Sequence, residues 1–465
     1  MHPSRTTRRS FLSGIAGATS LFADDAIIPA DIKLRIAPLK LEVAPGRFVE
    51  TVGYNGSVPC PLIRFRENET VTVDIFNETH VPEFVHWHGF DISTDVDGAE
   101  EEGSPAVAAH ERLRYRLTPV PAGFRYVHTH AMSMANLSRG TFTGQFGFAF
   151  VEPKSNPARY DQEVFLATHE WEPSLTHQEE EDDTSPPPRT SEHKGGEAGL
   201  HGWEIKYRYA TINGKCLGFG DPVRVKEGQR VLFHLLNASA TESVRLALPG
   251  HRFQVVALDG NPVPHPALVD MVELGAAERV DAIVTMDSPG VFVLGTPKNT
   301  SRTKGLGVVV EYANRTGKPL WVKPATNNWD YTTFGDQRVV PKPDEVIPLV
   351  IGQGARTTDG FESWTINRKG YDASKPVRLA RGRRYRLLFD NQTEDAHPVH
   401  LHRSSFELTS VSGTPTAGII KDVVLVKGHQ KVEADFTPSM TGLHLFHCHQ
   451  QLHMDYGFKM LFDVT

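Results

Sequence analysis

The sequence predicts an all-β protein of three consecutive β-sandwich domains. Its 465 residues are more than a single hydrophobic core usually serves, so length alone favours two to four domains. Many short strand-like runs are broken by Gly, Pro, Asn and Asp, and no long amphipathic helix stands out between them. Together with an internal repeat, this pattern is typical of β-sandwiches joined in one chain.

The repeat consists of a polar turn, an alternating or apolar strand, and an asparagine at the strand end. It occurs at residues 66–77, 226–237 and 380–391. Along the sequence, the closing residues Asn77, Asn237 and Asn391 are separated by about the number of residues in one domain. We therefore predict domains at 24–157, 158–330 and 331–465.

Two segments fall outside these sandwiches. Residues 1–23 contain Thr7-Arg8-Arg9-Ser10-Phe11-Leu12 before a short, weakly apolar run. This segment resembles a twin-arginine export signal, with a disordered basic tail as the alternative, and predicts a periplasmic or secreted protein. Residues 179–199 are acidic, then Pro-rich, then Gly-containing, which predicts a flexible insertion in the middle domain. His169, His177, His193 and His201 lie in or beside it and make a metal-trapping loop the alternative, but a solvated flexible loop is favoured.

Composition narrows the possible functions. The formal net charge of -7 argues against nucleic acid as a partner, because phosphate binding needs clustered positive charge. Outside the N-terminal segment, no stretch approaches the roughly 20 apolar residues of a membrane span. Cys60, Cys216 and Cys448 are the only cysteines, so at most one disulfide can form. The chain has 22 histidines, which is the more unusual count.

Ten of these histidines and one cysteine form four short clusters. The clusters are His86-Trp87-His88, His128-Thr129-His130, His397-Pro398-Val399-His400-Leu401-His402, and His447-Cys448-His449 with His453. Residues two apart on a strand point the same way, so each His-x-His pair aims two imidazoles at one point. Four such pairs supply enough nitrogens for three metal ions but too many for one.

The remaining cluster residues predict a second, separate site. Cys448 lies between two histidines of one pair and must point to the opposite face, and the offset of His397 from His400 also favours that face. Cys448, His397 and His453 can therefore hold one metal ion. Two imidazoles and a thiolate form the blue-copper ligand set. Zinc is disfavoured because structural zinc sites rarely use eight imidazoles in pairs. Iron is disfavoured because its set of two histidines and one carboxylate lacks the carboxylate here.

The four clusters resemble the copper signatures of three-domain multicopper oxidases, the group that contains laccases, bilirubin oxidases and bacterial cuprous oxidases. Asn55-Gly56, Pro59-x-Pro61-x-Ile63-Arg64 and Ile212-Asn213-Gly214-Lys215 extend the resemblance over essentially the whole mature chain. The resemblance implies cupredoxin-like Greek-key β-sandwich domains, with a three-copper cluster shared by the first and third domains.

The resemblance also implies four coppers per chain. His397, Cys448 and His453 match the type 1 ligands, and His86 and His400 match the type 2 ligands. The type 3 pair would be held by six residues: His88, His128, His130, His402, His447 and His449. A reductant would give electrons through His453, and Cys448 would pass them to the cluster that reduces O2 to water. Asp97 matches a proton-relay carboxylate in relatives, although a turn aspartate before Gly98 is the alternative.

Several positions depart from the family pattern. Phe458 replaces the axial methionine and cannot bind copper, which favours a laccase-like, high-potential type 1 site; Met460 is the less favoured axial donor. Leu452 stands where many bacterial relatives carry a second proton-relay glutamate, so that route has no assigned residue. None of the eight methionines forms a Met-rich tract, so we expect phenols and aromatic amines as reductants before Cu(I).

Three further expectations complete the prediction. The chain is expected to work as a monomer, because three domains suffice for both sites. A cuprous oxidase or a copper-resistance protein of the same fold is the alternative function, and copper nitrite reductase ranks well below. Cys60 and Cys216 either form a disulfide between the first and middle domains or are buried thiols.

Overall fold

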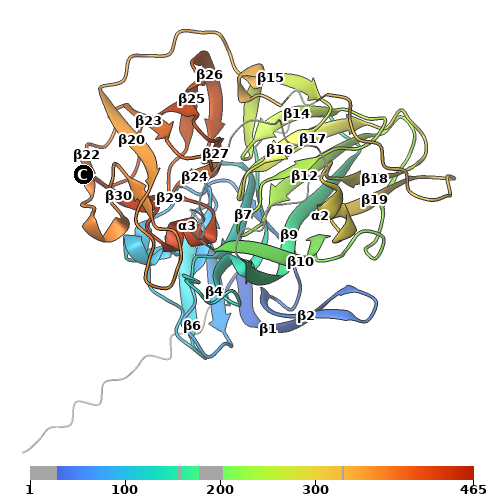
Figure 1. Ribbon diagram of the computed structural model, residues 1–465, viewed down its shortest axis with the longest axis horizontal. Helices are drawn as coiled ribbons and strands as arrows, with labels where there is room; N and C mark the ends of the chain where they lie inside the picture. The colour runs from blue at the N-terminus through green and yellow to red at the C-terminus, as the bar shows by residue number, and fades with distance from the viewer. Residues whose placement is uncertain (1–28, 155–158, 177–202, 327–328) are drawn as a thin grey trace, which may run out of the picture.

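The computed structural model describes residues 29–154, 159–176, 203–326 and 329–465. The expected export signal and the expected insertion at 179–199 lie outside these ranges. Within them, strands dominate and the few helices are short, which confirms the all-β prediction (Figure 1). No helix of the described residues is long and apolar enough to cross a membrane.

The first third of the chain forms two four-stranded sheets. One has the order β2-β1-β4-β6, with β1 (Ile32–Ala44), β2 (Arg47–Tyr54), β4 (Val71–Asn77) and β6 (Arg112–Leu117). The other has the order β3-β8-β7-β5, with β3 (Cys60–Arg66), β5 (Val85–His88), β7 (Gly123–Thr129) and β8 (Phe146–Glu152). Short helical turns at α1 (Thr94–Asp97), η1 (Glu100–Glu102) and η2 (Gly140–Phe142) join them.

The middle third is built on a six-stranded sheet in the order β10-β9-β12-β17-β14-β15. Its strands are β9 (Gln162–Thr176), β10 (Glu204–Ile212), β12 (Arg230–Asn237), β14 (Phe253–Leu258), β15 (Asn261–Val269) and β17 (Arg279–Thr285). Smaller sheets are formed by β11 (Val223–Val225), β18 (Val291–Gly295) and β19 (Gly307–Tyr312), and by β13 (Val244–Leu246) and β16 (Val272–Leu274). The helix α2 (Asn299–Thr303) precedes β19.

The last third has a six-stranded and a five-stranded sheet. The first, in the order β21-β20-β23-β28-β25-β26, contains β20 (Glu345–Gln353), β21 (Trp364–Ile366), β23 (Tyr385–Asn391), β25 (Phe406–Val411), β26 (Thr414–Lys421) and β28 (Lys431–Phe436). The second, in the order β22-β30-β29-β24-β27, contains β22 (Val377–Leu379), β24 (His397–Leu401), β27 (Val423–Val426), β29 (Gly442–Cys448) and β30 (Lys459–Val464). The turns η3 (Tyr331–Phe334) and η4 (Tyr371–Ala373) and the helix α3 (Gln451–Asp455) complete this part.

The predicted repeat is present in all three parts. The strands β4, β12 and β23 each lie between a parallel neighbour and an antiparallel neighbour. The closing asparagines have the same structural role, because each buried side-chain amide donates to at least two backbone carbonyls of neighbouring segments. Asn77 donates to Val81 and Val107 (2.8 and 2.9 Å), and Asn237 and Asn391 make the corresponding bonds. The exact boundaries near 157 and 330 stay predictions.

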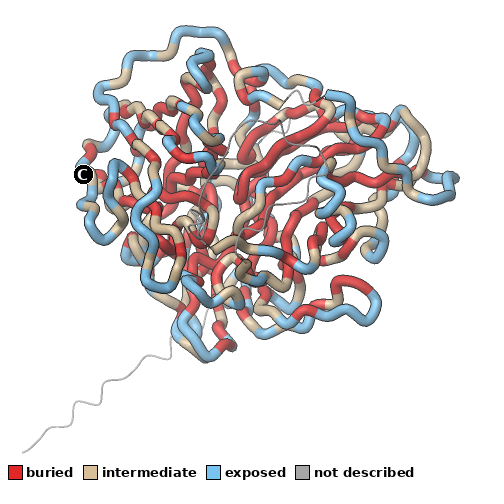
Figure 2. The backbone as a smooth tube through the Cα atoms, viewed as in Figure 1, coloured by how far each residue is buried: buried red, intermediate tan, exposed pale blue. Residues whose placement is uncertain are grey.

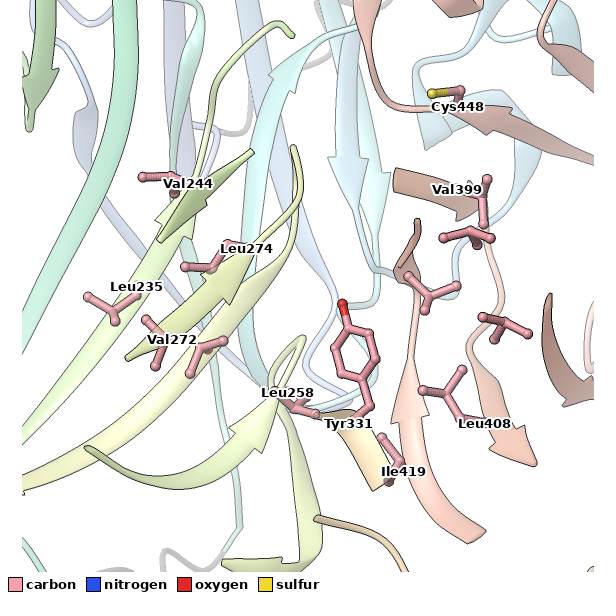
Figure 3. Packing of buried hydrophobic residues seen from close by; sticks show 14 of the residues in the cluster. Leu235, Val244, Leu258, Val272, Leu274, Tyr331, Val399, Leu408, Ile419 and Cys448 are labelled. Atoms are coloured by element: carbon pink, nitrogen blue, oxygen red, sulfur yellow. The ribbon is translucent and has the colours of Figure 1, made fainter. Parts of the chain in front are cut away.

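Buried side chains join the parts into one body. Figure 2 shows the buried strands running through the interior, with exposed turns around them. One hydrophobic cluster is continuous from the middle part into the last part, and Figure 3 shows Tyr331 between Leu258 on one side and Leu408 on the other. Two further clusters fill the first part and its junction with the middle part. The first and last parts are therefore held in fixed positions.

Candidate metal centres

The four His-x-His pairs meet where a sheet of the first part faces a sheet of the last part. In the first part, β5 pairs with β7 so that His86 lies opposite His128. In the last part, β24 pairs with β29 so that His400 lies opposite His447. All eight of these histidines are buried. The predicted convergence of the pairs is observed.

Imidazoles from the two ends of the chain interleave in this centre. The rings of His86 and His402 stack with centroids 4.0 Å apart, and those of His88 and His400 stack at 3.8 Å. Three overlapping groups have ligand atoms within 4.8 Å of one another: His86 with His400 and His402, His86 with His88 and His128, and His130 with His402 and His447. The donor set therefore has room for several closely spaced metal ions.

In each imidazole, the ring nitrogen that donates a hydrogen bond to the surrounding protein is protonated. The other ring nitrogen, which faces the centre, therefore carries a lone pair. His402 Nδ1 donates to Asp97 Oδ2 (2.8 Å) and His447 Nδ1 donates to the Cys448 carbonyl (2.8 Å), so both Nε2 atoms are unprotonated. These two Nε2 atoms face each other at 3.0 Å. Two facing lone pairs repel unless a cation lies between or beside them, so this geometry fits a metal centre.

A second facing pair follows the same rule. His88 Nε2 donates to Asp422 Oδ1 (3.1 Å) and His128 Nδ1 donates to the Thr129 carbonyl (2.8 Å). The remaining nitrogens, His88 Nδ1 and His128 Nε2, face each other at 3.3 Å. His88 thus presents Nδ1 to the centre, because a carboxylate occupies its other nitrogen.

Several other nitrogens of the centre have no hydrogen-bond partner. The Nδ1 atoms of His86 and His400 lie 2.9 and 2.7 Å from the backbone carbonyls of Asp97 and Asp422. Their Nε2 atoms are buried without a hydrogen bond, as is Nδ1 of His449. An unpartnered buried polar atom costs about 1–3 kcal/mol, so several at one point indicate atoms reserved for a ligand.

Burial also keeps the imidazoles neutral. It lowers the pKa of His88, His128, His400, His402 and His449 well below the usual 6.5, and neighbouring histidines lower it further. Neutral imidazoles keep the lone pairs that a metal ion needs.

Cys448 points to the opposite side of β29 and lies in a second group. Its Sγ is 3.7 Å from His397 Nδ1 and 3.6 Å from His453 Nδ1, and the two Nδ1 atoms are 3.1 Å apart. The Thr393 hydroxyl donates to Asn391 Oδ1 and accepts from His397 Nε2 at 2.9 Å, which leaves the lone pair of His397 on Nδ1. The predicted trio is therefore assembled, with its ligand atoms directed at one point.

The surroundings of this trio are aromatic. Phe458 is fully buried, and its ring centroid lies 5.0 Å from that of His397. Trp364 is buried against His453, with ring centroids 4.1 Å apart, while His453 itself is only partly buried. Met460 pairs with Phe446 in β29 and is part of the hydrophobic core.

The geometry is matched by sequence comparison over most of the chain. Three family models, each described as multicopper oxidase, match residues 37–156, 186–311 and 341–465. The chain belongs to the multicopper oxidase family. Members of this family are copper oxidoreductases that use O2, and the predicted enzyme class and cupredoxin-like fold are confirmed.

Curated relatives and solved structures cover nearly the whole multicopper oxidase. The multicopper oxidase MmcO of Mycobacterium tuberculosis (strain ATCC 25618 / H37Rv) is 28% identical over 97% of this chain and 91% of its own. The multicopper oxidase mco of Staphylococcus aureus is 23% identical over 92% of this chain and 86% of its own. The multi-copper oxidase of Pseudomonas thermotolerans has a TM-score of 0.69 at 23% identity, covering 94% of this chain and 100% of that one. The laccase of Botrytis aclada has a TM-score of 0.72 at 18% identity, covering 93% and 87%.

Asp97 sits inside the three-copper region predicted for this multicopper oxidase. Its Oδ2 accepts from His402 Nδ1 and lies 3.1 Å from His86 Nδ1, while its Oδ1 is buried without a partner. The turn interpretation holds as well, because Gly98 has a φ of +89° and a Cβ there would lie 1.9 Å from the Val85 carbonyl oxygen. Asp97 therefore ends a tight turn and contacts two histidines of the centre.

Several residues around the centres were not predicted from the sequence. Asp422 accepts from His88 and forms a bidentate pair with Arg279, both contacts being 2.6 Å. The only signal was a charged pair, Lys421-Asp422, between two apolar strand runs. Thr393 and Trp364 carried no signal at all.

The second proton route remains without a sequence-based residue. Leu452 is mostly buried in the hydrophobic core. Glu101 approaches the centre from the first part instead, with Oε2 3.8 Å from His130 Nδ1 and Oε1 2.6 Å from Lys459. Cys60 and Cys216 are free and buried, so the structure favours the buried-thiol alternative over a disulfide.

Proposed function

We propose that this multicopper oxidase oxidises small aromatic reductants, phenols and aromatic amines, one electron at a time at a type 1 copper. It couples four such steps to the reduction of one O2 and four protons to two waters at a three-copper cluster. The observation that carries the proposal is the pair of complete donor sets, each with converging ligand atoms, joined by His447-Cys448-His449. Copper, when bound, supplies the one-electron redox chemistry at both centres.

We assign the ligands as follows. His397, Cys448 and His453 hold the type 1 copper, and His86 and His400 hold the type 2 copper. The type 3 pair is held by His88, His128, His130, His402, His447 and His449. The unpartnered Nε2 atoms of His86 and His400 are available to an ion, and their assignment as a separate pair follows the family resemblance. The facing nitrogens of His88 and His128, and of His402 and His447, support their use by closely spaced ions.

The chain's own residues supply the route for electrons and protons. His453 is the partly exposed member of the type 1 set, so a reductant reaches its edge first. Cys448 is covalently continuous with His447 and His449, which provides a short backbone path to the cluster. Asp97, with one oxygen on the histidines and one unpartnered, holds and transfers protons at the cluster.

The aromatic preference rests on the type 1 surroundings. Trp364 forms an aromatic wall against His453, and Phe458 brings no donor atom to the copper, which favours a higher potential. A second candidate function is Cu(I) oxidation. Met132 and Met134, which are 40% and 39% exposed just after the second His-x-His pair, favour it. The comparison of O2 consumption with a phenol and with Cu(I), described next, also tests a copper-resistance role of the same fold.

The copper-loaded protein provides the test. It should be blue, with intense absorption near ~600 nm as expected of a thiolate–copper site. It should consume O2 with a substituted phenol faster than with Cu(I), and Cys448→Ser should lose both the colour and the O2 uptake. A colourless copper-loaded protein would overturn the proposal, and faster turnover of Cu(I) would reverse the order of the two functions.

We also propose that the chain is exported to the periplasm or beyond through the twin-arginine signal and works as a monomer. Cell fractionation of the chain and of an Arg8→Lys/Arg9→Lys variant tests the export. A retained variant is expected, and equal export of both proteins would contradict the signal. Size-exclusion chromatography with light scattering tests the monomer.

A further inference from the structure

A pair of histidines outside both centres faces each other on the surface of the first part. His80 follows β4 and His110 precedes β6, and both side chains are exposed. His110 Nε2 and His80 Nδ1 are 2.9 Å apart, with the ring planes inclined by 66°. Neither residue belongs to the four clusters described above.

The two turns that carry this pair are tied together by a buried residue. The Asn77 side chain donates to the carbonyls of Val81 and Val107, one in each loop. The Asn77 backbone amide donates to the Glu111 carbonyl at 3.0 Å, directly beside His110. These hydrogen bonds fix the two loops relative to each other. The backbones that carry His80 and His110 therefore need little additional ordering when both side chains bind one ligand.

The threefold repeat shows which part of this arrangement is general to the fold. In the middle and last parts, Asn237 and Asn391 donate their backbone amides to Glu278 and Gln430 in the same way. The residues that correspond to His110 are Ala277 and His429, and all three have left-handed backbones, with φ of +60°, +71° and +57°. The left-handed turn thus belongs to the fold and says nothing about function.

The side chains at the equivalent positions differ. The middle part has Ala240 and Ala277, which cannot bind an ion. The last part has Glu394 and His429, with Oε1 and Nε2 4.0 Å apart. Among the three equivalent positions, only the first part carries two imidazoles whose nitrogens converge. The equivalent positions in the middle and last parts therefore serve as controls within the same chain.

We propose that His80 and His110 form a surface site for a divalent transition-metal ion with a tetragonal preference, Cu²⁺ first and Ni²⁺ next. Two imidazole nitrogens at about 2.0–2.1 Å from one ion lie about 2.9 Å apart if they occupy adjacent tetragonal positions. In a tetrahedral site the separation is about 3.3–3.4 Å, so the two nitrogens, held 2.9 Å apart by their shared hydrogen bond, already have the spacing of adjacent tetragonal positions.

The chemistry of binding is simple at this place. As neutral rings, the two imidazoles share one N–H between facing nitrogens, and the ion displaces that proton, which moves to another ring nitrogen. Water occupies the remaining coordination positions because both rings are exposed. Cu²⁺ binds such imidazole sites more tightly than Ni²⁺ in the general order of divalent ions.

The test uses the copper-loaded enzyme, titrated with Cu²⁺, Ni²⁺ and Zn²⁺ by calorimetry. The wild type should bind one added ion that is lost in His80→Ala/His110→Ala, with affinity at least about tenfold weaker in either single variant. His429→Ala is the matched control and should bind as the wild type does. Comparison with the variants, not total stoichiometry, decides the outcome, because His177, His193 and His201 lie outside the described residues.

A gain of binding provides the second arm. Glu394→His places a second imidazole beside His429 and should add a second ion, which Glu394→His/His429→Ala should lose. Turnover of a phenol should be unchanged in the His80 and His110 variants, which confirms that they fold. Unchanged metal affinity in His80→Ala/His110→Ala would overturn the proposal, as would wild-type binding of Zn²⁺ more tightly than Cu²⁺.

Discussion

Removing the charge of His234 should weaken the junction between the first and middle domains in a pH-dependent way. His234 is buried in β12, and its Nδ1 donates to Asp281 Oδ1 at 2.8 Å. Its ring stacks on Phe165 at 4.2 Å and touches two phenylalanines of the first domain, Phe124 and Phe150. The perturbation is His234→Gln, which keeps a donor for Asp281 but cannot be charged.

The size of the effect follows from the charges around the ring. Burial alone would lower the pKa of His234, but the carboxylates of Asp281 and Glu163 outweigh it and raise the pKa from 6.5 to about 9. At about 1.4 kcal/mol per pH unit, this difference corresponds to about 3 kcal/mol. Because the folded-state pKa is raised, the stabilisation is fully present below about pH 6.5 and is lost as the pH rises through about 9.

Urea unfolding of the wild type and His234→Gln at a series of pH values measures this contribution. The variant should be less stable by about 2–3 kcal/mol near pH 6, and the gap should close towards pH 10. His169→Gln is a control, because burial lowers the pKa of His169 to about 4 and keeps it neutral above pH 6.5. A stability gap for His234→Gln that does not change with pH would refute the reasoning.

Three further substitutions test the proposed centres and the domain interface. Phe458→Met should lower the type 1 potential in a redox titration, and no change or a rise would exclude the axial assignment. Asp97→Asn should slow reoxidation of the reduced enzyme by O2 without slowing anaerobic bleaching of the blue colour by a phenol; equal loss of both steps would assign Asp97 a purely structural role. Lys421→Met leaves Glu278 buried without its cation and Asp259 with only Arg279, at 3.8 Å, and should cost about 3–5 kcal/mol in urea unfolding. Adding Glu278→Gln should recover part of that loss, and no recovery would contradict the charge-pair explanation.

Local strand geometry explains why so much of the site could be predicted from the sequence. His86 and His88, or His447 and His449, must point the same way, and Cys448 must point the opposite way, because the side-chain period of a strand is two. The structure places them accordingly. The repeated asparagines were visible as a pattern, but their common hydrogen bonds were not, because one acceptor of each lies at least 30 residues further along the chain.

The partners of the metal ligands depend on long-range packing and could not be predicted. Asp422 reaches His88 from the opposite end of the chain, and Arg279 reaches Asp422 from the middle domain. Thr393 is the exception, because it lies only four residues before His397, in the connection from β23 to β24, yet the residue pattern there did not reveal the contact. Trp364 contacts His453 because β21 pairs with β20, and no local sequence pattern predicts that pairing. Periodicity identifies ligands within one strand, whereas their supports come from the tertiary fold.

The interleaved histidines have a consequence for how this protein matures. Half of the eight come from near the beginning of the chain and half from near its end, and they occupy one shared contact region. An ion that binds only the assembled region favours assembly in proportion to its free concentration. Bound copper should thus stabilise the contact between the first and last parts of the chain. The copper-free protein should be digested by proteases more readily than the copper-loaded protein. Metal loading therefore adds to the stability of an assembly that hydrophobic packing already holds together.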